Sequence, residues 1–143
     1  MRLVRDGLSR VYRQGRDAMD AALADGSDDA MHEWRKRAKD LRYQLEMLEP
    51  LWCTVMKATA DEAHELGNQL GDDHDLAVLT DLISGDGDLH DACPKADRQA
   101  LQGLVARRQE SLRAHAKRIG RRIYVERPKD LRARLDAYWK ALD

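Results

Sequence analysis

The sequence predicts an all-α protein, an antiparallel four-helix bundle with a short fifth helix at its C-terminal end. The first observation is composition: 36% of the 143 residues are charged, 5% are aromatic and phenylalanine is absent, which is typical of long charged helices and not of sheet proteins. The second is that apolar residues recur at helical spacing, and no stretch alternates as a strand does. The third is that short turns separate these segments, which favours antiparallel neighbours within a single domain of residues 1–143.

Capping residues and a proline define the first two helices. The first is expected over about residues 3–24, before the turn that contains Gly26. The second begins near the N-cap candidate Ser27. It ends by about residue 49, because Pro50 cannot continue a helix.

Three further helices follow. The third is expected over about residues 52–83, and Gly71 within it allows a kink. After a glycine- and aspartate-rich loop, the fourth begins at Pro94 and reaches about Tyr124. The fifth begins at Pro128 and is expected to bury Leu131, Leu135 and Trp139.

The net charge of −1 conceals two regions of opposite sign. Residues 1–60 carry a net charge of +1, residues 61–97 a net charge of −10 and residues 98–143 a net charge of +8. Near-neutrality of the whole chain therefore does not exclude an anionic partner, since binding depends on where the charges lie.

The second helix concentrates positive charge on one face. At about 100° per residue, six side chains share an arc of roughly 120°: His32, Arg35, Lys36, Lys39, Arg42 and Tyr43. The opposite face is apolar and supplies the predicted core positions Trp34, Ala38, Leu41, Leu45 and Leu48. An ordinary solvated face mixes acids and bases as i,i+4 pairs, and this one does not.

Two other helices carry similar basic stripes. The first has Arg2, Arg5, Arg13 and Arg16 within about 80°, and the fourth has Arg107, Lys117, Arg118, Arg121 and Arg122 within about 140°. Each stripe adjoins an apolar face, so we expect packing to bring all three toward one groove. The guanidinium fork and the lysine ammonium both suit phosphate oxygens, which favours a linear polyanion as the ligand.

The residue types leave three interpretations of this surface. Few aromatic side chains lie near the stripes, which disfavours the stacking platforms of single-strand binders, and no recognition helix or basic arm is evident. Binding of phosphate without bases fits better, although contact with a nucleic-acid backbone remains an alternative. A third interpretation is a helical interaction or scaffold domain whose basic stripes face solvent and bind no polyanion.

Two segments resemble the motifs of the CHAD family, the conserved histidine α-helical domain. They are the run from His32 to Tyr43 with the following Leu45-Glu46-Met47-Leu48, and the run Leu70-Gly71-Asp72-Asp73-His74-Asp75-Leu76-Ala77-Val78-Leu79. Residues 12–16 and Lys57 agree with the same family, so the resemblance covers roughly residues 5–125.

The resemblance implies an all-helical domain that binds inorganic polyphosphate in a basic channel and associates with polyphosphate granules. Carried over by position, it identifies His32, Arg35, Lys36, Lys39, Arg42 and Tyr43 as binding residues, followed by Arg13, Arg16 and Lys57. Arg118, Arg121 and Arg122 are counted as binding residues mainly because they belong to the basic stripe of the fourth helix. A full domain resembles two helical halves in tandem, and this chain resembles the C-terminal half. We therefore expect pairing with a missing first half or with another copy.

The acidic segment does not have the pattern of a metal centre. Bundle di-metal sites use paired Glu-x-x-His motifs, whereas this segment has a single Asp61-x-x-His64. Asp75 is expected to pair with a basic residue of a neighbouring helix. No nucleophile or phosphate-loop motif is present, so we expect no metal, no cofactor and no catalytic residue.

Cysteine usage and hydropathy indicate the compartment. Cys53 and Cys93 are too few for a disulfide framework, which predicts free thiols in a reducing environment. No apolar run approaches the roughly 20 residues that cross a bilayer, and the N-terminal residues lack a secretory pattern. We expect a cytoplasmic protein, located at polyphosphate granules according to the resemblance.

Overall fold

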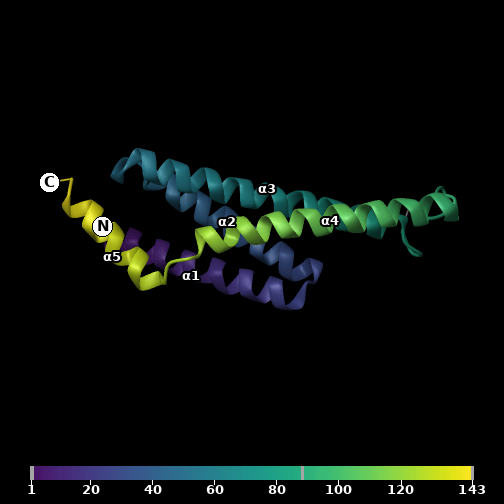
Figure 1. The fold of residues 1–143 in the computed structure, drawn as a ribbon, viewed down its shortest axis with the longest axis horizontal. Coiled ribbons are helices and arrows are strands. Elements are labelled where there is room, and N and C mark those ends of the chain that lie inside the picture. The colour runs from purple at the N-terminus through teal and green to yellow at the C-terminus, as the bar shows by residue number, and fades with distance from the viewer. Residues whose placement is uncertain (1, 88, 143) are drawn as a thin grey trace.

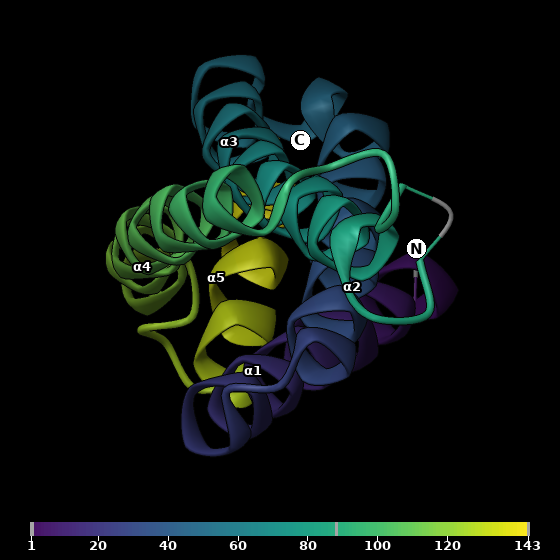
Figure 2. The same ribbon diagram turned by 90° about the vertical axis from the view of Figure 1, so that its right-hand side faces the viewer.

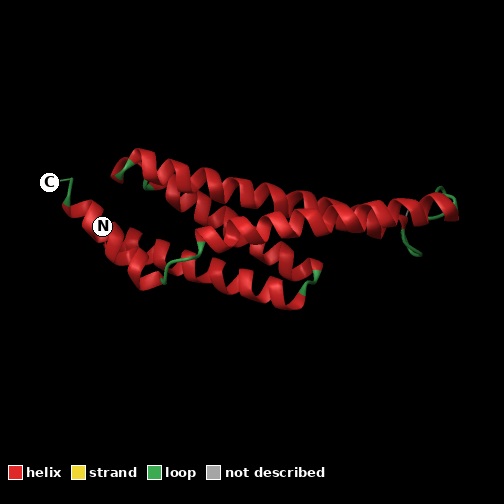
Figure 3. Cartoon of the chain, viewed as in Figure 1, coloured by secondary structure: helices red, strands yellow, loops and turns green. Residues whose placement is uncertain are grey.

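The protein is an all-α helical bundle with a short C-terminal helix, as predicted (Figures 1 and 3). The computed structural model describes residues 2–87 and 89–142, with side chains from residue 6 onward. Its elements are α1 (Arg2–Asp25), α2 (Asp28–Met47), the one-turn 3₁₀ helix η1 (Glu49–Leu51), α3 (Cys53–Ile83), α4 (Lys95–Ile123) and α5 (Pro128–Lys140). No strand occurs among these residues. The predicted stripe residues Arg2 and Arg5 lie outside the described side chains.

Local chemistry explains the turn between α1 and α2. Gly26 has a φ of 70°, a left-handed conformation that glycine adopts without strain. Its N–H donates to the carbonyl oxygen of Ala22 at 2.9 Å. The Ser27 Oγ then accepts the N–H of Ala30 at 3.2 Å and caps α2, as the sequence predicts.

The remaining helix boundaries also lie close to the expected residues. Pro50 lies in η1, which separates α2 from α3. Helix α3 continues without a break through Gly71, where the sequence allows a kink. Trp139 was expected to contribute to the core of α5, but 45% of it is exposed. Its neighbour Tyr138 packs against the core instead, since it lies on the same side as Leu131 and Leu135.

The helices are arranged so that α2 packs between α1 and α3, α3 also packs against α4, and α5 lies along α1 (Figures 1 and 2). The last turns of α3 and the first turns of α4 extend beyond α1 and α2 as an antiparallel pair (Figure 1). We call this pair, residues 72–83 and 95–112, the arm. The opposite half of the molecule is the bundle.

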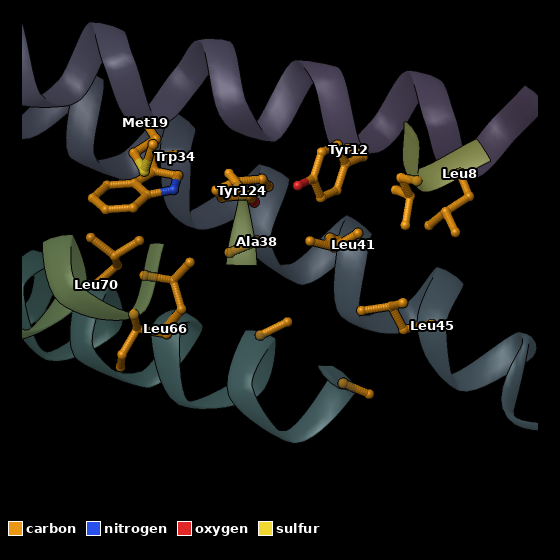
Figure 4. Packing of buried hydrophobic residues seen from close by; sticks show 14 of the residues in the cluster. Leu8, Tyr12, Met19, Trp34, Ala38, Leu41, Leu45, Leu66, Leu70 and Tyr124 are labelled. Atoms are coloured by element: carbon orange, nitrogen blue, oxygen red, sulfur yellow. The ribbon is translucent and has the colours of Figure 1, made fainter. Parts of the chain in front are cut away.

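The core lies inside the bundle and is centred on α2 (Figure 4). Trp34 is fully buried and lies beside Met19 of α1. A Cβ atom on Gly120 of α4 would lie 2.5 Å from the Trp34 ring and 2.9 Å from the Met19 sulfur. Only glycine therefore lets α4 approach this closely. The five core positions predicted on α2 are all buried.

One buried ion pair joins three parts of the chain. Asp73 is 1% exposed, and its Oδ1 accepts the Nε–H of Arg113 at 2.7 Å while its Oδ2 accepts an Nη2–H at 3.0 Å. Arg113 also donates to the carbonyl oxygen of Gly26 at 2.7 Å and to Asp28 at 2.6 Å. The hydrogen bonds that Arg113 donates to Asp73 raise the pKa of Arg113. The helix-to-helix pair that the sequence assigned to Asp75 is thus made by Asp73, because Asp75 is exposed on the outside of α3.

Candidate functional site

The best-defined polar depression lies between α2 and α3. It has a volume of about 250 Å³. Helix α2 contributes its basic face and α3 contributes small and polar residues, so the lining consists of Arg35, Lys39, Arg42, Tyr43, Ala63, His64, Gly67 and Asn68. We call this depression the α2–α3 groove.

Small residues on α3 create the groove. Ala63, Gly67 and Gly71 recur every four residues and therefore form one line along the helix. A Cβ on Gly67 would lie 3.8 Å from Cγ of Lys39, and one on Gly71 would lie 3.3 Å from Nε and Nη2 of Arg35. The long basic side chains of α2 thus extend over α3 backbone, in space that larger α3 side chains would fill.

Two cations in the groove are not neutralised. Among the described residues, no carboxylate lies within ion-pair distance of Arg35 or Lys39. The Nε of Arg35 is moreover buried and has no hydrogen-bond partner within the protein. A buried donor without an acceptor is costly, so an anion that enters the groove would relieve this cost.

Arg42 and His64 meet across one end of the groove. The Arg42 Nη1 lies 2.7 Å from the His64 Nδ1, and the Arg42 Nε donates to Glu46 at 2.7 Å. Since a guanidinium can only donate, the His64 Nδ1 must accept, which places the ring proton on Nε2. Arg42 also lies 5.7 Å from the centroid of the Tyr43 ring. Half of Tyr43 is exposed, so its hydroxyl is accessible at the groove rim.

A pair of histidines continues the basic face toward the arm. The rings of His32 on α2 and His74 on α3 lie 4.6 Å apart and are tilted by 35°. Both side chains are half-buried, and the Nδ1 of His32 is buried without a hydrogen-bond partner. His74 lies one turn beyond Gly71 on α3, so the two rings stand beside Arg35 at the adjoining turn.

Two predicted binding residues on the rim are paired with acids. Lys36 contacts Glu33 at 2.7 Å and Lys57 contacts Asp61 at 3.2 Å, both on exposed surface. The Lys36 hydrogen bond lowers the pKa of Glu33. Such exposed pairs contribute little energy and open easily. Lys57 precedes His64 by two turns of α3, about 10 Å.

The basic stripe of α1 does not reach the groove. Arg16 donates to the carbonyl oxygen of Glu126 at 3.1 Å, and Ser9 of the same flank lies 3.5 Å from the carbonyl oxygen of Pro128. This flank faces the connection to α5. Arg13 is exposed. On the other flank of α1, Gly7 lies against Gln44 of α2, so α2 separates Arg13 and Arg16 from α3.

The basic stripe of α4 is likewise separate. Arg122 pairs with Glu62 at 3.0 Å, in a shallow depression lined by Ala58, Thr59 and Ile123. Arg118 and Arg121 are exposed nearby, as are Arg107 and Lys117 along the same helix. The expectation that packing brings all three stripes into one groove is therefore not met. The physical reason is that α1 and α3 pack on different flanks of α2 without contacting each other closely, and α4 packs against α3 on the side away from the groove.

Sequence reasoning did not assign two groove residues, His64 and Asn68, or the neighbouring His74 to the binding site. His64, Asn68 and His74 come from α3, which the sequence analysis treated as an acidic segment. A signal was present, because His64, Gly67, Gly71 and His74 follow one another at spacings of three and four, which places them on one helix face. A helix face that packs in a core is usually made of apolar residues, so a face made of histidines and glycines indicates an open surface.

Comparison with known families matches the helices that form this groove. A family model for the CHAD domain matches residues 1–84. The chain belongs to the CHAD domain family. The match includes α1, α2 and α3, and hence both walls of the groove, but ends at Ser84 and does not extend to about residue 125 as the resemblance implied. No curated protein and no solved structure matches the chain.

The described residues contain no cluster of metal ligands, no disulfide and no membrane-spanning helix. No group of three or more histidine, cysteine, aspartate or glutamate side chains there could hold a metal ion. Cys53 and Cys93 are free thiols. None of the described helices combines the length and apolar character needed to span a membrane.

Proposed function

We propose that this CHAD domain is a non-catalytic module that binds inorganic polyphosphate in the α2–α3 groove. The observation that carries the proposal is the pair Arg35 and Lys39, which face the groove without a carboxylate partner among the described residues. Phosphate oxygens supply the acceptors that these cations lack. Guanidinium and phosphate form charge-assisted hydrogen bonds, which are among the strongest in proteins.

Each basic or aromatic residue of the groove has a defined role in this proposal. The Arg35 fork binds one phosphate against the α3 backbone, and Lys39 supplies a mobile charge for the next. Arg42 closes the far end, where the His64 Nε2–H and the Tyr43 hydroxyl donate further hydrogen bonds. Residues 35 to 42 span about 10 Å along α2, so successive phosphates of one chain are held together.

The other predicted residues are sorted by position. His32 and His74 extend the site at the arm end, and Lys36 and Lys57 lie on its rim. Arg13, Arg16, Arg118, Arg121 and Arg122 lie outside the groove and receive no role in the primary site. Binding neutralises phosphates and releases condensed counterions, as with nucleic-acid backbones, so affinity should fall steeply as salt rises.

A matched pair of charge reversals tests the proposal. Lys39→Glu and Arg121→Glu both replace an exposed cation with an anion, but only the first lies in the groove. Titration with fluorescently labelled long-chain polyphosphate should show a loss of affinity of about tenfold or more for Lys39→Glu, and a much smaller loss for Arg121→Glu. Equal losses would mean that total charge, not the groove, controls binding.

Competition separates polyphosphate from nucleic acid. Half of Tyr43 is exposed at the groove rim and offers one face for base stacking, which is the feature that favours a nucleic-acid ligand. Unlabelled polyphosphate should displace the labelled chain at lower phosphate concentration than single-stranded DNA or RNA. The reverse order would support the nucleic-acid alternative. Failure of every polyanion to bind at moderate salt would leave a scaffold domain.

Location at polyphosphate granules is a further part of the proposal. A fluorescent fusion of the wild-type chain should concentrate on granules in cells that make polyphosphate, whereas the Lys39→Glu fusion should stay diffuse. A Lys39→Glu fusion that remains on granules would show that recruitment does not use the groove.

A further inference from the structure

The arm has an apolar flank that its own two helices leave uncovered. Leu76 and Leu79 of α3 and the buried Leu112 of α4 form an open depression of about 400 Å³. Leu104 lies two turns before Leu112 on α4 and is 59% exposed. We call this depression, with Leu104, the arm flank.

Packing within the arm is thin. Its buried apolar residues are Ala77, Ile83, Val105 and Leu112, and none of them belongs to the core cluster of the bundle. Two antiparallel helices bury a single seam between them, whereas a four-helix bundle encloses its apolar residues from all sides. Figures 1 and 2 show that α3 and α4 lie side by side here, with no other helix over them.

The rims of the arm flank carry opposite charges. Asp72 and Asp75 border it on α3, and Arg108 borders it on α4. Among the described residues, none of these three has an ion-pair partner. The charges thus lie at one level along the arm, acidic on one helix and basic on the other.

This distribution selects one kind of partner and one symmetry. A two-fold axis parallel to the arm places α3 of each copy over α4 of the other. Asp72 and Asp75 of each copy then face Arg108 of the other copy. A two-fold axis across the arm would instead place α3 over α3, and acids would face acids. Both axes leave the facing helices antiparallel, so the charges decide between them, and only the parallel axis gives complementary rims.

We propose that the arm flank is a self-association surface, on which the arm of a second copy docks about a two-fold axis to complete a four-helix bundle. Leu76, Leu79 and Leu104 form its apolar centre, and the rim pairs set its register. This inference is independent of the proposed polyphosphate binding. A dimer carries two α2–α3 grooves, so a long polyanion would bind it bivalently, and that consequence alone depends on the proposed function.

Sedimentation of the chain without polyphosphate tests the inference. Across a wide range of loading concentrations, the mass should rise from 16.4 kDa toward twice that value. Leu104→Glu should weaken the dimer about tenfold or more, because it puts a carboxylate into the apolar centre. Val125→Glu is the matched control, since Val125 is 73% exposed on the connection between α4 and α5, and it should not change the dimer.

A charge exchange tests the symmetry. Asp75→Arg and Arg108→Asp should each weaken association, because each places like charges opposite one another, and the double variant should restore it. Circular dichroism of every variant verifies that helix content is retained. A wild-type chain that stays monomeric at all concentrations, a Leu104→Glu dimer of undiminished strength, or a double variant no better than the singles would overturn the proposal. None of these results would bear on polyanion binding.

Discussion

Replacing Asp73 with alanine should be among the most destabilising single changes in this chain. The carboxylate is 1% exposed and accepts two hydrogen bonds from Arg113, at 2.7 and 3.0 Å. Removing one partner of a buried ion pair costs about 3–5 kcal/mol, because the other charge loses its compensation. Arg113 is 24% exposed and keeps its contact with Asp28. We therefore expect the lower end of that range, about 3 kcal/mol.

Urea unfolding followed by circular dichroism measures this loss. A loss of about 3 kcal/mol is a large part of the 5–15 kcal/mol that stabilises a typical domain, so the midpoint should fall clearly. Asp130→Ala is the control, since Asp130 forms an ion pair of similar length, 2.6 Å, with Arg127 on exposed surface. Its midpoint should barely move. Equal midpoints for the two variants would refute the argument that burial makes the Asp73 pair important.

Three further predictions follow from burial and close packing. Gly120→Ala should cost about 1–3 kcal/mol in the same urea assay, because the new methyl lies 2.5 Å from the Trp34 ring; an unchanged midpoint would contradict the close approach. Gly67→Leu should fill the α2–α3 groove and reduce polyphosphate affinity about tenfold or more in the binding titration. Its free energy of unfolding should stay level or rise, because leucine favours the helix over glycine by up to about 1 kcal/mol. Full binding by this variant would show that the groove is not the binding site. Burial raises the pKa of Tyr12 to about 12, and burial also raises the pKa of Tyr124 above its ordinary range. Phenols in the unfolded chain ionise near pH 10, whereas the folded state keeps these two phenols neutral to higher pH. The folded state is therefore fully stable below about pH 10 and loses free energy of unfolding as the pH rises toward about 12. Phenolate absorbance and helix content recorded together should change in this window, and a native helix signal with all tyrosines ionised would contradict the prediction.

The helices could be predicted because their determinants are local. Gly26, Ser27, Pro50 and Pro128 act through backbone conformation or a single hydrogen bond, so each position identifies a helix end directly. The core face of α2 was predictable for a related reason, since Trp34 and its companions repeat at helical spacing.

The groove could be predicted only on its α2 side. The basic face of α2 is a property of one helix, whereas the groove also requires α3 to place Gly67 and Gly71 beneath Arg35 and Lys39. The direction in which each stripe faces depends on which neighbours cover the helix. That information is tertiary, and it explains why the stripes of α1 and α4 were expected in the groove but lie elsewhere.

The same limit applies to the buried ion pair. The sequence predicted that Asp75 of α3 pairs with a neighbouring helix, whereas the residue that does so is Asp73, and its partner on α4 is Arg113. Asp72, Asp73 and Asp75 are equivalent in composition, and a rotation of about 100° per residue separates the buried carboxylate from the exposed ones. Only the packing of α4 on α3 decides between them.

Because main chain rather than bulky side chains forms the floor of the α2–α3 groove, the shape of the binding surface is preorganised. Helix α3 is hydrogen-bonded throughout this segment, and Gly67 and Gly71 have no rotamers to rearrange when a ligand arrives. The ordering cost of capture therefore falls on a few flexible cations above that floor, chiefly Lys39, and not on the scaffold. A rigid trough beneath mobile charges accommodates a polymer in any register, so chains of differing length should slide through it without forcing the domain to change conformation.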